Sequence, residues 1–396
     1  DYDNSRMELR VLTKEPAAVD CMIAGKGVDS FCISGMSNET IAIDLPDFHP
    51  WSPEDPFCYQ ISIRTDTDRV SSYFAMRKCD VQTGPDGKRR FFLNNKPYFQ
   101  AGVLDQGYWP ESLYTAPTDE ALLSDILRMK KLGFNMLRKH AKIEPERFYY
   151  HCDQLGILVW QDMVNGGSPY KSWFVTYLAT LMNWRHLPFS DGEKHFSLLS
   201  RSQPEGRAEF LREMEETVTF LYNHPSIVTW VPFNEGWGQF HAADAAARLK
   251  QLDPTRLVDH ASGWFDQKAG DIVSLHYYFF TLNFKAETAR ALALTEFGGY
   301  SFSMPEHSAS ETVYGYRKFT SAAELTAAYE KLMERTVLPA VQKGIGASVY
   351  TQLSDIEEET NGIYTYDRAV CKLDPDTVRK WNQKLKEAGF SENPTE

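Results

Sequence analysis

The chain has 396 residues, of which 42 % are hydrophobic and 24 % are charged, and its formal net charge is −12. This composition is ordinary for a soluble globular protein, and the length suffices for one large domain and a smaller one, each with its own core. The negative charge argues against a nucleic-acid partner, because a phosphate backbone requires a clustered basic surface. No apolar stretch approaches the roughly 20 residues that cross a bilayer, so we expect no membrane partner.

The start of the chain and its cysteines bear on where the protein works. The chain opens at Asp1 without a methionine or a signal-like segment, which is typical of a mature product or of a fragment. Secretion therefore stays open, with a cytoplasmic location slightly favoured. The six cysteines lack CxxC or metal-finger spacing, and we interpret them as buried free thiols rather than as disulfides or zinc ligands. They are Cys21, Cys32, Cys58, Cys79, Cys152 and Cys371.

The first part of the chain predicts a small β domain. Residues 1–82 contain short β-rich runs such as MELRVL, DSFCIS and FCYQISIRT, interrupted by Gly, Pro, Asp and Asn. This pattern is typical of an immunoglobulin-like antiparallel β-sandwich, either complete or truncated at its start. Residues 83–90, TGPDGKRR, predict a turn-rich hairpin or linker.

From Lys96 onward, apolar strands alternate with amphipathic helices, which indicates a parallel sheet with crossover helices. Eight strands favour a (β/α)8 TIM barrel over residues 83–396. An open dinucleotide-binding sheet is disfavoured because no GxGxxG follows the first strand. The expected strands are 98–105, 134–140, 157–163, 227–235, 256–262, 271–278, 291–299 and 345–355. The expected helices are 118–133, 144–156, 205–224, 242–252, 321–344 and 374–389. A long excursion over 164–204 is expected to form a wall of the active site.

Two glutamates end expected strands: Glu235 in IVTWVPFNEGWG and Glu296 in ALALTEFGG. TIM barrels gather their catalytic residues at the carboxyl ends of the strands, so both carboxylates are expected to point into one pocket. Two carboxylates in one pocket are the groups that cut a glycosidic bond. One of them must begin protonated, which requires surroundings that raise its pKa. A solvated surface position is the alternative for any single glutamate.

Several strings, in their order along the chain, resemble glycoside hydrolase family 2, which contains β-galactosidases, β-glucuronidases and β-mannosidases. They are WSPEDP, NNKPYFQAG, GFNMLRKH, EPERFYYHCDQLGILVWQDM, HPSIVTWVPFNEGW, TEFGG and NGIYTYDR. The resemblance implies a retaining, exo-acting β-glycosidase that works through a covalent glycosyl-enzyme. It assigns Glu235 as the acid/base and Glu296 as the nucleophile.

The same resemblance suggests supporting residues. It implies that Asn234 binds the sugar 2-hydroxyl, that Arg138 lies close to the nucleophile, and that Tyr278 donates a hydrogen bond to it. A turn cap and a structural salt bridge are the alternatives for Asn234 and Arg138.

Other residues near the expected strand ends are further candidates for substrate contact. They are His140, His276, Trp264 as a stacking ring, and Asp355 at the rim, where Glu357 also lies. Asp162 is expected either to bind a sugar hydroxyl or to hold Arg138. Tyr350 stands where many relatives have tryptophan and is expected to change the floor of the sugar subsite. The alternative interpretations are a structural histidine for His140, loop packing for Trp264 and a solvated charge run for the segment that contains Asp355.

The substrate prediction depends on differences from the family. β-Glucuronidases carry an Asn-x-Lys motif ahead of the GIxTxDR string, whereas this chain has Glu359-Thr360-Asn361, without the lysine and with acids nearby. An acidic rim repels a uronate, so we expect a neutral sugar, with a β-galactoside first. A glucuronide, mannoside or arabinoside is the alternative. The family's amino-terminal sugar-binding sandwich has no counterpart in this sequence, and we expect the subsite to lack what that domain adds in some relatives.

A catalytically silent carbohydrate-binding module is the alternative from another class. We expect a carbohydrate partner, no cofactor and no metal, since no HxH or clustered His/Asp set appears at the strand ends. The sequence leaves the oligomeric state open, and a homo-oligomer is one of the states that we expect.

Overall fold

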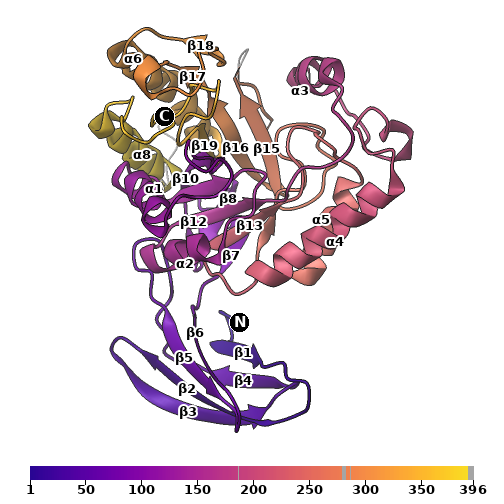
Figure 1. The fold of residues 1–396 in the computed structure, drawn as a ribbon, viewed down its shortest axis with the longest axis vertical. Coiled ribbons are helices and arrows are strands. Elements are labelled where there is room, and N and C mark those ends of the chain that lie inside the picture. The colour runs from indigo at the N-terminus through magenta and orange to yellow at the C-terminus, as the bar shows by residue number, and fades with distance from the viewer. Residues whose placement is uncertain (186, 279–281, 286, 391–396) are drawn as a thin grey trace.

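Small antiparallel sheets precede a larger parallel barrel in the computed structural model, which describes residues 1–185, 187–278, 282–285 and 287–390 (Figure 1). One sheet pairs β1 (Arg6–Arg10) with β4 (Thr40–Asp44). The other has the strand order β3-β2-β5-β6. Its strands are β2 (Ala18–Gly25), β3 (Val28–Met36), β5 (Tyr59–Arg64) and β6 (Arg69–Phe74).

The two small sheets share one apolar core. Side chains along β2 alternate between exposed and buried, which is the period of a strand with one covered face. Val19 and Ile23 of β2 pack in one cluster with Ile41 and Ile43 of β4 and with Ile61 of β5. The antiparallel architecture expected for this region is thus confirmed, while its immunoglobulin-like character and its boundary at residue 82 stay proposals.

A hairpin connects these sheets to the barrel. Strand β7 (Cys79–Thr83) pairs with β8 (Arg89–Leu93), and β9 (Lys96–Pro97) follows. The hairpin expected over 83–90 is therefore confirmed. Phe91 of β8 belongs to the apolar cluster inside the barrel, where its ring lies 5.9 Å from that of Trp160.

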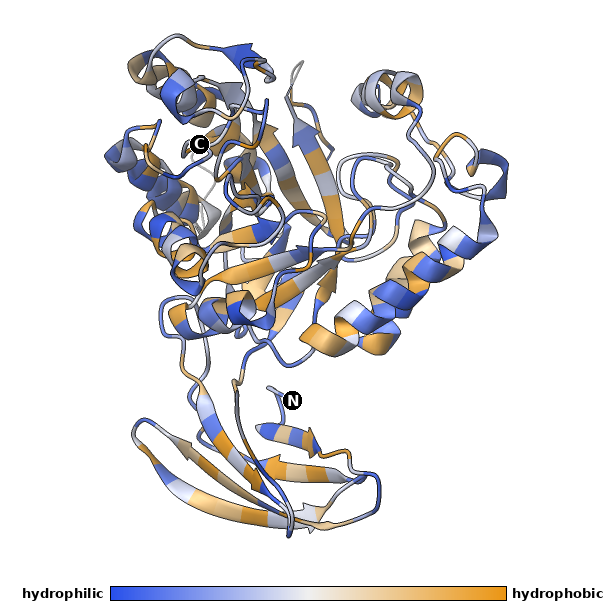
Figure 2. Ribbon diagram, viewed as in Figure 1, coloured by the Kyte–Doolittle hydropathy of each residue, from blue (hydrophilic) through white to orange (hydrophobic). Residues whose placement is uncertain are grey.

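Eight parallel strands form a nearly closed barrel in the order β14-β13-β12-β11-β10-β19-β16-β15, which confirms the expected fold class. No ladder joins β14 to β15 among the described residues, and β14 has only two residues. The strands are β10 (Gln100–Asp105), β11 (Met136–Lys139), β12 (Leu158–Asp162), β13 (Ile227–Val231), β14 (Leu257–Val258), β15 (Ile272–Tyr277), β16 (Ala291–Gly298) and β19 (Ile345–Thr351). Figure 2 shows the strands as largely hydrophobic, as expected for strands covered on both faces.

Amphipathic helices cover the outside of the barrel. They are α1 (Asp119–Lys131), α2 (Glu146–Leu155), α4 (Pro204–Leu221), α5 (Ala242–Leu252), α6 (Ala322–Leu332), α7 (Leu338–Lys343) and α8 (Pro375–Phe390). The helix expected over 321–344 is divided into α6, a π-helical turn η4 (Met333–Val337) and α7. Helix α1 illustrates how the sequence determines these helices. Thr118 caps its first turn and accepts a hydrogen bond from the N–H of Ala121. Leu122, Ile126 and Met129 share one face of the helix, which packs against the core.

The long segment between β12 and α4 folds into short helical elements. It contains a π-helical turn η1 (Trp173–Leu178), the short helix α3 (Ala179–Trp184) and a 3₁₀ turn η2 (Glu193–His195). We call η1 and α3 together the helical arm. The loops after β16 add β17 (Tyr300–Ser301), η3 (Pro305–His307) and β18 (Arg317–Lys318).

All six cysteines are free thiols, as expected. The expectation that they are buried holds for Cys21 and Cys152, whereas Cys58, Cys79 and Cys371 are half-buried. It is wrong for Cys32, which is exposed because it lies on the outer face of β3. Within the described part of the chain, no helix combines the length and the apolar character that a membrane span requires.

Candidate active site

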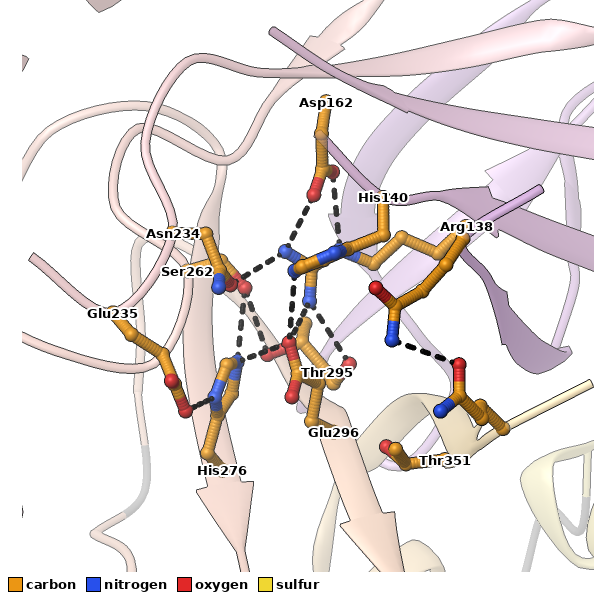
Figure 3. Close-up of polar contacts among 12 residues, drawn as sticks. Arg138, His140, Asp162, Asn234, Glu235, Ser262, His276, Thr295, Glu296 and Thr351 are labelled. Atoms are coloured by element: carbon orange, nitrogen blue, oxygen red, sulfur yellow. Dashed lines mark hydrogen bonds and ion pairs between the residues drawn. The ribbon is translucent and has the colours of Figure 1, made fainter. Parts of the chain in front are cut away.

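Polar side chains from seven barrel strands or the turns after them converge at the carboxyl end of the barrel, as the residues labelled in Figure 3 illustrate. Arg138 lies at the centre of this group and is fully buried. Its guanidinium donates to both carboxylate oxygens of Asp162 at 3.1 and 2.9 Å, to Oε1 of Glu296 at 3.0 Å and to Oδ1 of Asn234 at 2.8 Å. Burial opposes its charge, but Asp162 and Glu296 more than offset this and raise the pKa of Arg138. A permanent cation therefore stands beside Glu296.

Glu296 also accepts a hydrogen bond from a phenol. The hydroxyl of Tyr278 lies 2.5 Å from Oε2 of Glu296 and 2.8 Å from Oγ1 of Thr351. Burial raises the pKa of Tyr278, so this hydroxyl keeps its proton and acts as a donor. Glu296 is thus held by a cation on one carboxylate oxygen and by a hydroxyl donor on the other.

Glu235 has different neighbours. Its backbone adopts the left-handed conformation with φ 50°, and its N–H donates to the carbonyl of Ser262 at 2.8 Å. Non-glycine residues held in this conformation occur preferentially at functional sites. Burial raises the pKa of Glu235 to about 7, against the opposing charge of Arg138. Near neutral pH, a substantial part of Glu235 therefore carries its proton.

His276 connects the two carboxyl groups. Its Nδ1 lies 2.8 Å from Oε1 of Glu235, and its Nε2 lies 3.1 Å from Oγ of Ser262 and 3.7 Å from Oε1 of Glu296. Burial lowers the pKa of His276 to about 4, so the ring is neutral. With Glu235 protonated, its O–H donates to Nδ1, and the Nε2–H then points toward Ser262 and Glu296. One carboxylate oxygen of Glu235, one of Glu296 and a ring nitrogen of His276 all lie within 4.8 Å of one another.

A glycine makes room for this histidine. Gly263 has φ 86°, and a Cβ built on it would lie 2.6 Å from Nδ1 of His276. No side chain fits there unless the imidazole moves. The loop after β14 is thus shaped to accept the ring that contacts Glu235.

These groups open into a cavity of about 750 Å³. His140 lines it, and burial lowers the pKa of His140 to about 3, so this ring is neutral as well. Glu359 lies on the lining and accepts hydrogen bonds from Gln106 at 3.1 Å and Gln352 at 2.9 Å. Burial raises the pKa of Glu359 to about 7. Among the described residues that line the cavity, none is lysine or arginine.

The sequence pattern of the glycosyl hydrolases family 2 TIM barrel domain matches residues 87–296, more than half of the chain. This chain belongs to glycoside hydrolase family 2. The family is a retaining one, and the family 2 resemblance of the sequence is confirmed.

Curated relatives of this family 2 chain are similar over its barrel. A β-galactosidase of Leuconostoc mesenteroides subsp. mesenteroides is 26 % identical over 251 residues, which cover 61 % of this chain and 21 % of that protein. A β-galactosidase of Staphylococcus xylosus is 25 % identical over 244 residues, which cover 61 % and 22 %. The match thus spans only about a fifth of the length of these relatives.

Solved structures of the family have the same fold. A family 2 β-galacturonidase from Eisenbergiella tayi, bound to galacturonate, has a TM-score of 0.64 at 18 % identity and covers 96 % of this chain and 68 % of its own. A β-D-glucuronidase from Dictyoglomus thermophilum has a TM-score of 0.67 at 14 % identity, with coverage of 96 % and 68 %. At these identities the similarity shows the fold alone.

Most predicted site residues of this family 2 chain do come together. Asn234, Glu235, Glu296, His140, His276, Tyr278 and Trp264 all line the cavity. Arg138 contacts Glu296 and Asn234, and Asp162 forms an ion pair with Arg138. Of the two roles expected for Asp162, the contact with Arg138 is therefore the one observed. Trp264 packs in the loop and its ring lies 5.4 Å from that of His276.

Two predicted residues lie elsewhere. Tyr350 does not form the floor of the cavity, because Val349 before it faces the barrel interior and Tyr350 faces outward, with its ring 5.3 Å from that of Tyr329 in α6. Asp355 is not on the rim: it is buried and accepts from the N–H of Gly362 and from Nζ of Lys372. The carboxylate of Asp355 is thus paired with Lys372, which follows it by seventeen residues in the chain.

Several site residues were not predicted. They are Ser262, Thr351, Tyr316, Gln106 and Gln352. Tyr316 stacks on Tyr278 with ring centroids 4.0 Å apart. Gln106 and Gln352 directly follow β10 and β19, so their positions at strand ends were the available signal. Tyr316 comes from a loop without a periodic pattern, and no sequence signal places it.

Glu235, His276 and Glu296 are also the described residues that could converge on a metal ion. A metal there would occupy the space between the two carboxylates and neutralise Glu296. The expectation that the protein needs no metal stays a prediction.

Proposed function

We propose that this chain is a retaining, exo-acting β-glycosidase in which Glu296 is the nucleophile and Glu235 the acid/base. The observation that carries this proposal is the electrostatic difference between two carboxyl groups with oxygens within 4.8 Å of each other. Glu296 faces Arg138 and the hydroxyl of Tyr278, whereas Glu235 has a pKa of about 7. Retaining glycosidases hold their carboxyl groups about 5–5.5 Å apart, whereas inverting enzymes need about 6.5–9.5 Å to admit a water.

The reaction proceeds in two displacements. Glu296 attacks the anomeric carbon while the proton of Glu235 moves to the glycosidic oxygen, so the leaving alcohol departs neutral. The ester formed on Glu296 removes its negative charge. Glu235, now ionised, takes a proton from water, and the resulting attack on the anomeric carbon releases the sugar and restores both groups.

Asn234 supports the charge that develops on the sugar. Its Oδ1 accepts from Arg138, which fixes the orientation of the amide and makes Nδ2 the end that is presented to the substrate. A hydrogen bond to the sugar 2-hydroxyl strengthens as the ring becomes oxocarbenium-like. Arg138 thus orients both Asn234 and Glu296.

We propose a neutral glycone, with a β-galactoside first. A uronate carboxylate would need a cation, and no lysine or arginine lines the cavity among the described residues. It would also meet Glu359, whose oxygens suit the hydroxyls of a neutral sugar. The curated relatives named above are β-galactosidases, which supports the same choice.

An aryl β-glycoside panel tests the proposal. It contains the galactoside, glucuronide, mannoside, fucoside and arabinoside, and the anomer formed first is followed by proton NMR. We expect the galactoside to be cleaved fastest, the β anomer to appear first, and Glu296→Ala to lower kcat by about 10³-fold or more. Glu306→Ala, which changes an exposed glutamate, is the matched control.

The outcomes separate the parts of the proposal. The α anomer as first product, or turnover that survives Glu296→Ala, contradicts the retaining mechanism. A preferred glucuronide contradicts the neutral glycone. Binding of sugars without turnover of any glycoside favours a silent carbohydrate-binding module.

A further inference from the structure

The helical arm stands over the active-site cavity. Figure 1 shows α3 apart from the helices that surround the barrel. Seven residues of the arm nevertheless line the same cavity as Glu235 and Glu296: Val175, Thr176, Tyr177, Thr180, Leu181, Asn183 and Trp184.

Three of these side chains are apolar or aromatic and open to solvent. Tyr177 is 74 % exposed, Leu181 45 % and Trp184 39 %. Contiguous exposed apolar side chains mark a site that a ligand or partner covers. Because these three line the cavity, a molecule held in the cavity contacts them directly.

The arm is connected to the acid/base side of the site. Phe174 and Val175 pack in one apolar cluster with Trp264, whose ring lies against His276, the hydrogen-bond partner of Glu235. The hydrogen-bonded pair Gln106 and Glu359 lies on other elements, because these residues follow β10 and β19, which are neighbours in the barrel. A leaving group that takes its proton from Glu235 therefore departs on the side of the arm.

The dimensions and chemistry of the arm limit what it binds. A cavity of about 750 Å³ lies in the upper part of the range of roughly 300–1,000 Å³ that holds drug-sized ligands, so a sugar leaves room for a second group. Among the described residues, the arm contributes no charged side chain to the lining. The hydroxyl of Thr180 donates to the carbonyl of Thr176 within the arm. Thr176 and Asn183 add a hydroxyl and an amide to the lining. A second sugar would need several hydrogen-bond partners, whereas a flat apolar ring needs contact area, which Tyr177, Leu181 and Trp184 supply.

We infer that the helical arm is the leaving-group subsite of the proposed glycosidase and selects glycosides of planar, largely apolar aromatic alcohols over disaccharides. This inference rests on the proposed function. Tyr177, Leu181 and Trp184 cover the aromatic leaving group while Glu235 protonates the oxygen that joins it to the sugar.

The test compares three substrates that share the sugar preferred in the panel: the 2-naphthyl glycoside, a disaccharide with glucose as the leaving group, and the glycosyl fluoride. The double variant Leu181→Ser/Trp184→Ala removes the apolar contacts. Trp173→Ala is the matched control, because Trp173 lies on the same arm, is 59 % exposed and is absent from the described lining. Fluoride is too small to reach the arm, so its hydrolysis reports folding and catalysis alone.

We expect the double variant to lower kcat/KM for the naphthyl glycoside by about tenfold or more. We expect hydrolysis of the fluoride to stay within about twofold of wild type and the disaccharide to lose less than the naphthyl glycoside, since bulk apolar contact is what is removed. Equal losses on all three substrates, a larger loss on the disaccharide, or no loss overturns the inference while leaving the glycosidase intact. A wild-type protein that hydrolyses none of the three overturns the proposed function and the subsite with it.

Discussion

Glu235 and Glu296 are chemically identical side chains, and their neighbours make them different. Arg138 and Tyr278 contact Glu296, whereas Glu235 is half-buried with the neutral ring of His276 at hydrogen-bond distance. The same element pattern, a strand that ends in a glutamate, thus places two carboxyl groups in unlike surroundings. A buried carboxyl group with a raised pKa, as at Glu235, is typical of a general acid.

The raised pKa of Glu235 predicts the pH profile. In the free enzyme, the acid/base must hold its proton before the first displacement, and burial places its pKa at about 7. We therefore expect kcat/KM for an unactivated aryl glycoside to fall as the pH rises through 7. The measurement is kcat/KM from pH 5 to 9 for wild type and Glu235→Gln.

The leaving group provides the control for this profile. In Glu235→Gln the basic limb should disappear, and a highly activated leaving group that needs no proton should lose far less rate in its first step than an unactivated one. A basic limb that persists unchanged in Glu235→Gln would show that another group titrates there.

Among the elements, the loop after β14 sets the position of His276, the hydrogen-bond partner of Glu235. Gly263 follows β14 and permits the close approach of His276 from β15, two strands between which no ladder is formed among the described residues. We predict that Gly263→Ala displaces the imidazole and lowers kcat by about tenfold or more, because small displacements of catalytic groups cost much rate. Steady-state kinetics with the aryl glycoside measure this effect.

A second glycine variant controls for the chemistry of the substitution. Gly206 lies in α4, and a Cβ there meets nothing within 4 Å. We expect Gly206→Ala to leave kcat unchanged and to raise the free energy of unfolding by about 0.5–1 kcal/mol. A Gly263→Ala protein with wild-type kcat would show that His276 does not need its present position.

The elements themselves could largely be predicted from the sequence, because hydrophobic periodicity reports burial directly. Strand ends then located Glu235 and Glu296, and the period of two placed His276 and Tyr278 on one face. Tyr350 was placed wrongly because its face of β19 depends on packing against α6. Asp355 was misplaced because its partner Lys372 is brought to it only by the tertiary fold. Ser262 and Thr351 gave no signal of their own, since small polar residues occur throughout loops and strands.

At the scale of the whole molecule, one buried carboxylate joins the small sheets to the barrel. Asp153 at the end of α2 accepts from the hydroxyl of Tyr73 in β6 at 2.7 Å and from the N–H of Ser226 before β13 at 2.8 Å. Nδ1 of His224 lies 2.7 Å from the same carboxylate. The indole of Trp51 donates to the backbone carbonyl of Asp153 at 2.8 Å.

We predict that Asp153→Ala lowers the free energy of unfolding by about 2–4 kcal/mol, because it leaves several buried polar groups without an acceptor. Urea denaturation followed by tryptophan fluorescence measures this. Asp20→Ala, on the exposed side of β2, is the control and should change stability by less than about 0.5 kcal/mol. Equal stabilities of the two variants would contradict a structural role for the Asp153 cluster.

The proposed mechanism requires that Glu296 form a covalent bond to the sugar, and that bond can be trapped. The two glutamates lie in different tryptic peptides, residues 213–248 for Glu235 and 291–317 for Glu296. After incubation with 2-deoxy-2-fluoro-β-galactosyl fluoride, we expect the mass of one fluorosugar on peptide 291–317, placed on Glu296 by fragmentation and absent from Glu296→Ala. A label on peptide 213–248, or no label from a protein that hydrolyses aryl galactosides, would contradict the assignment.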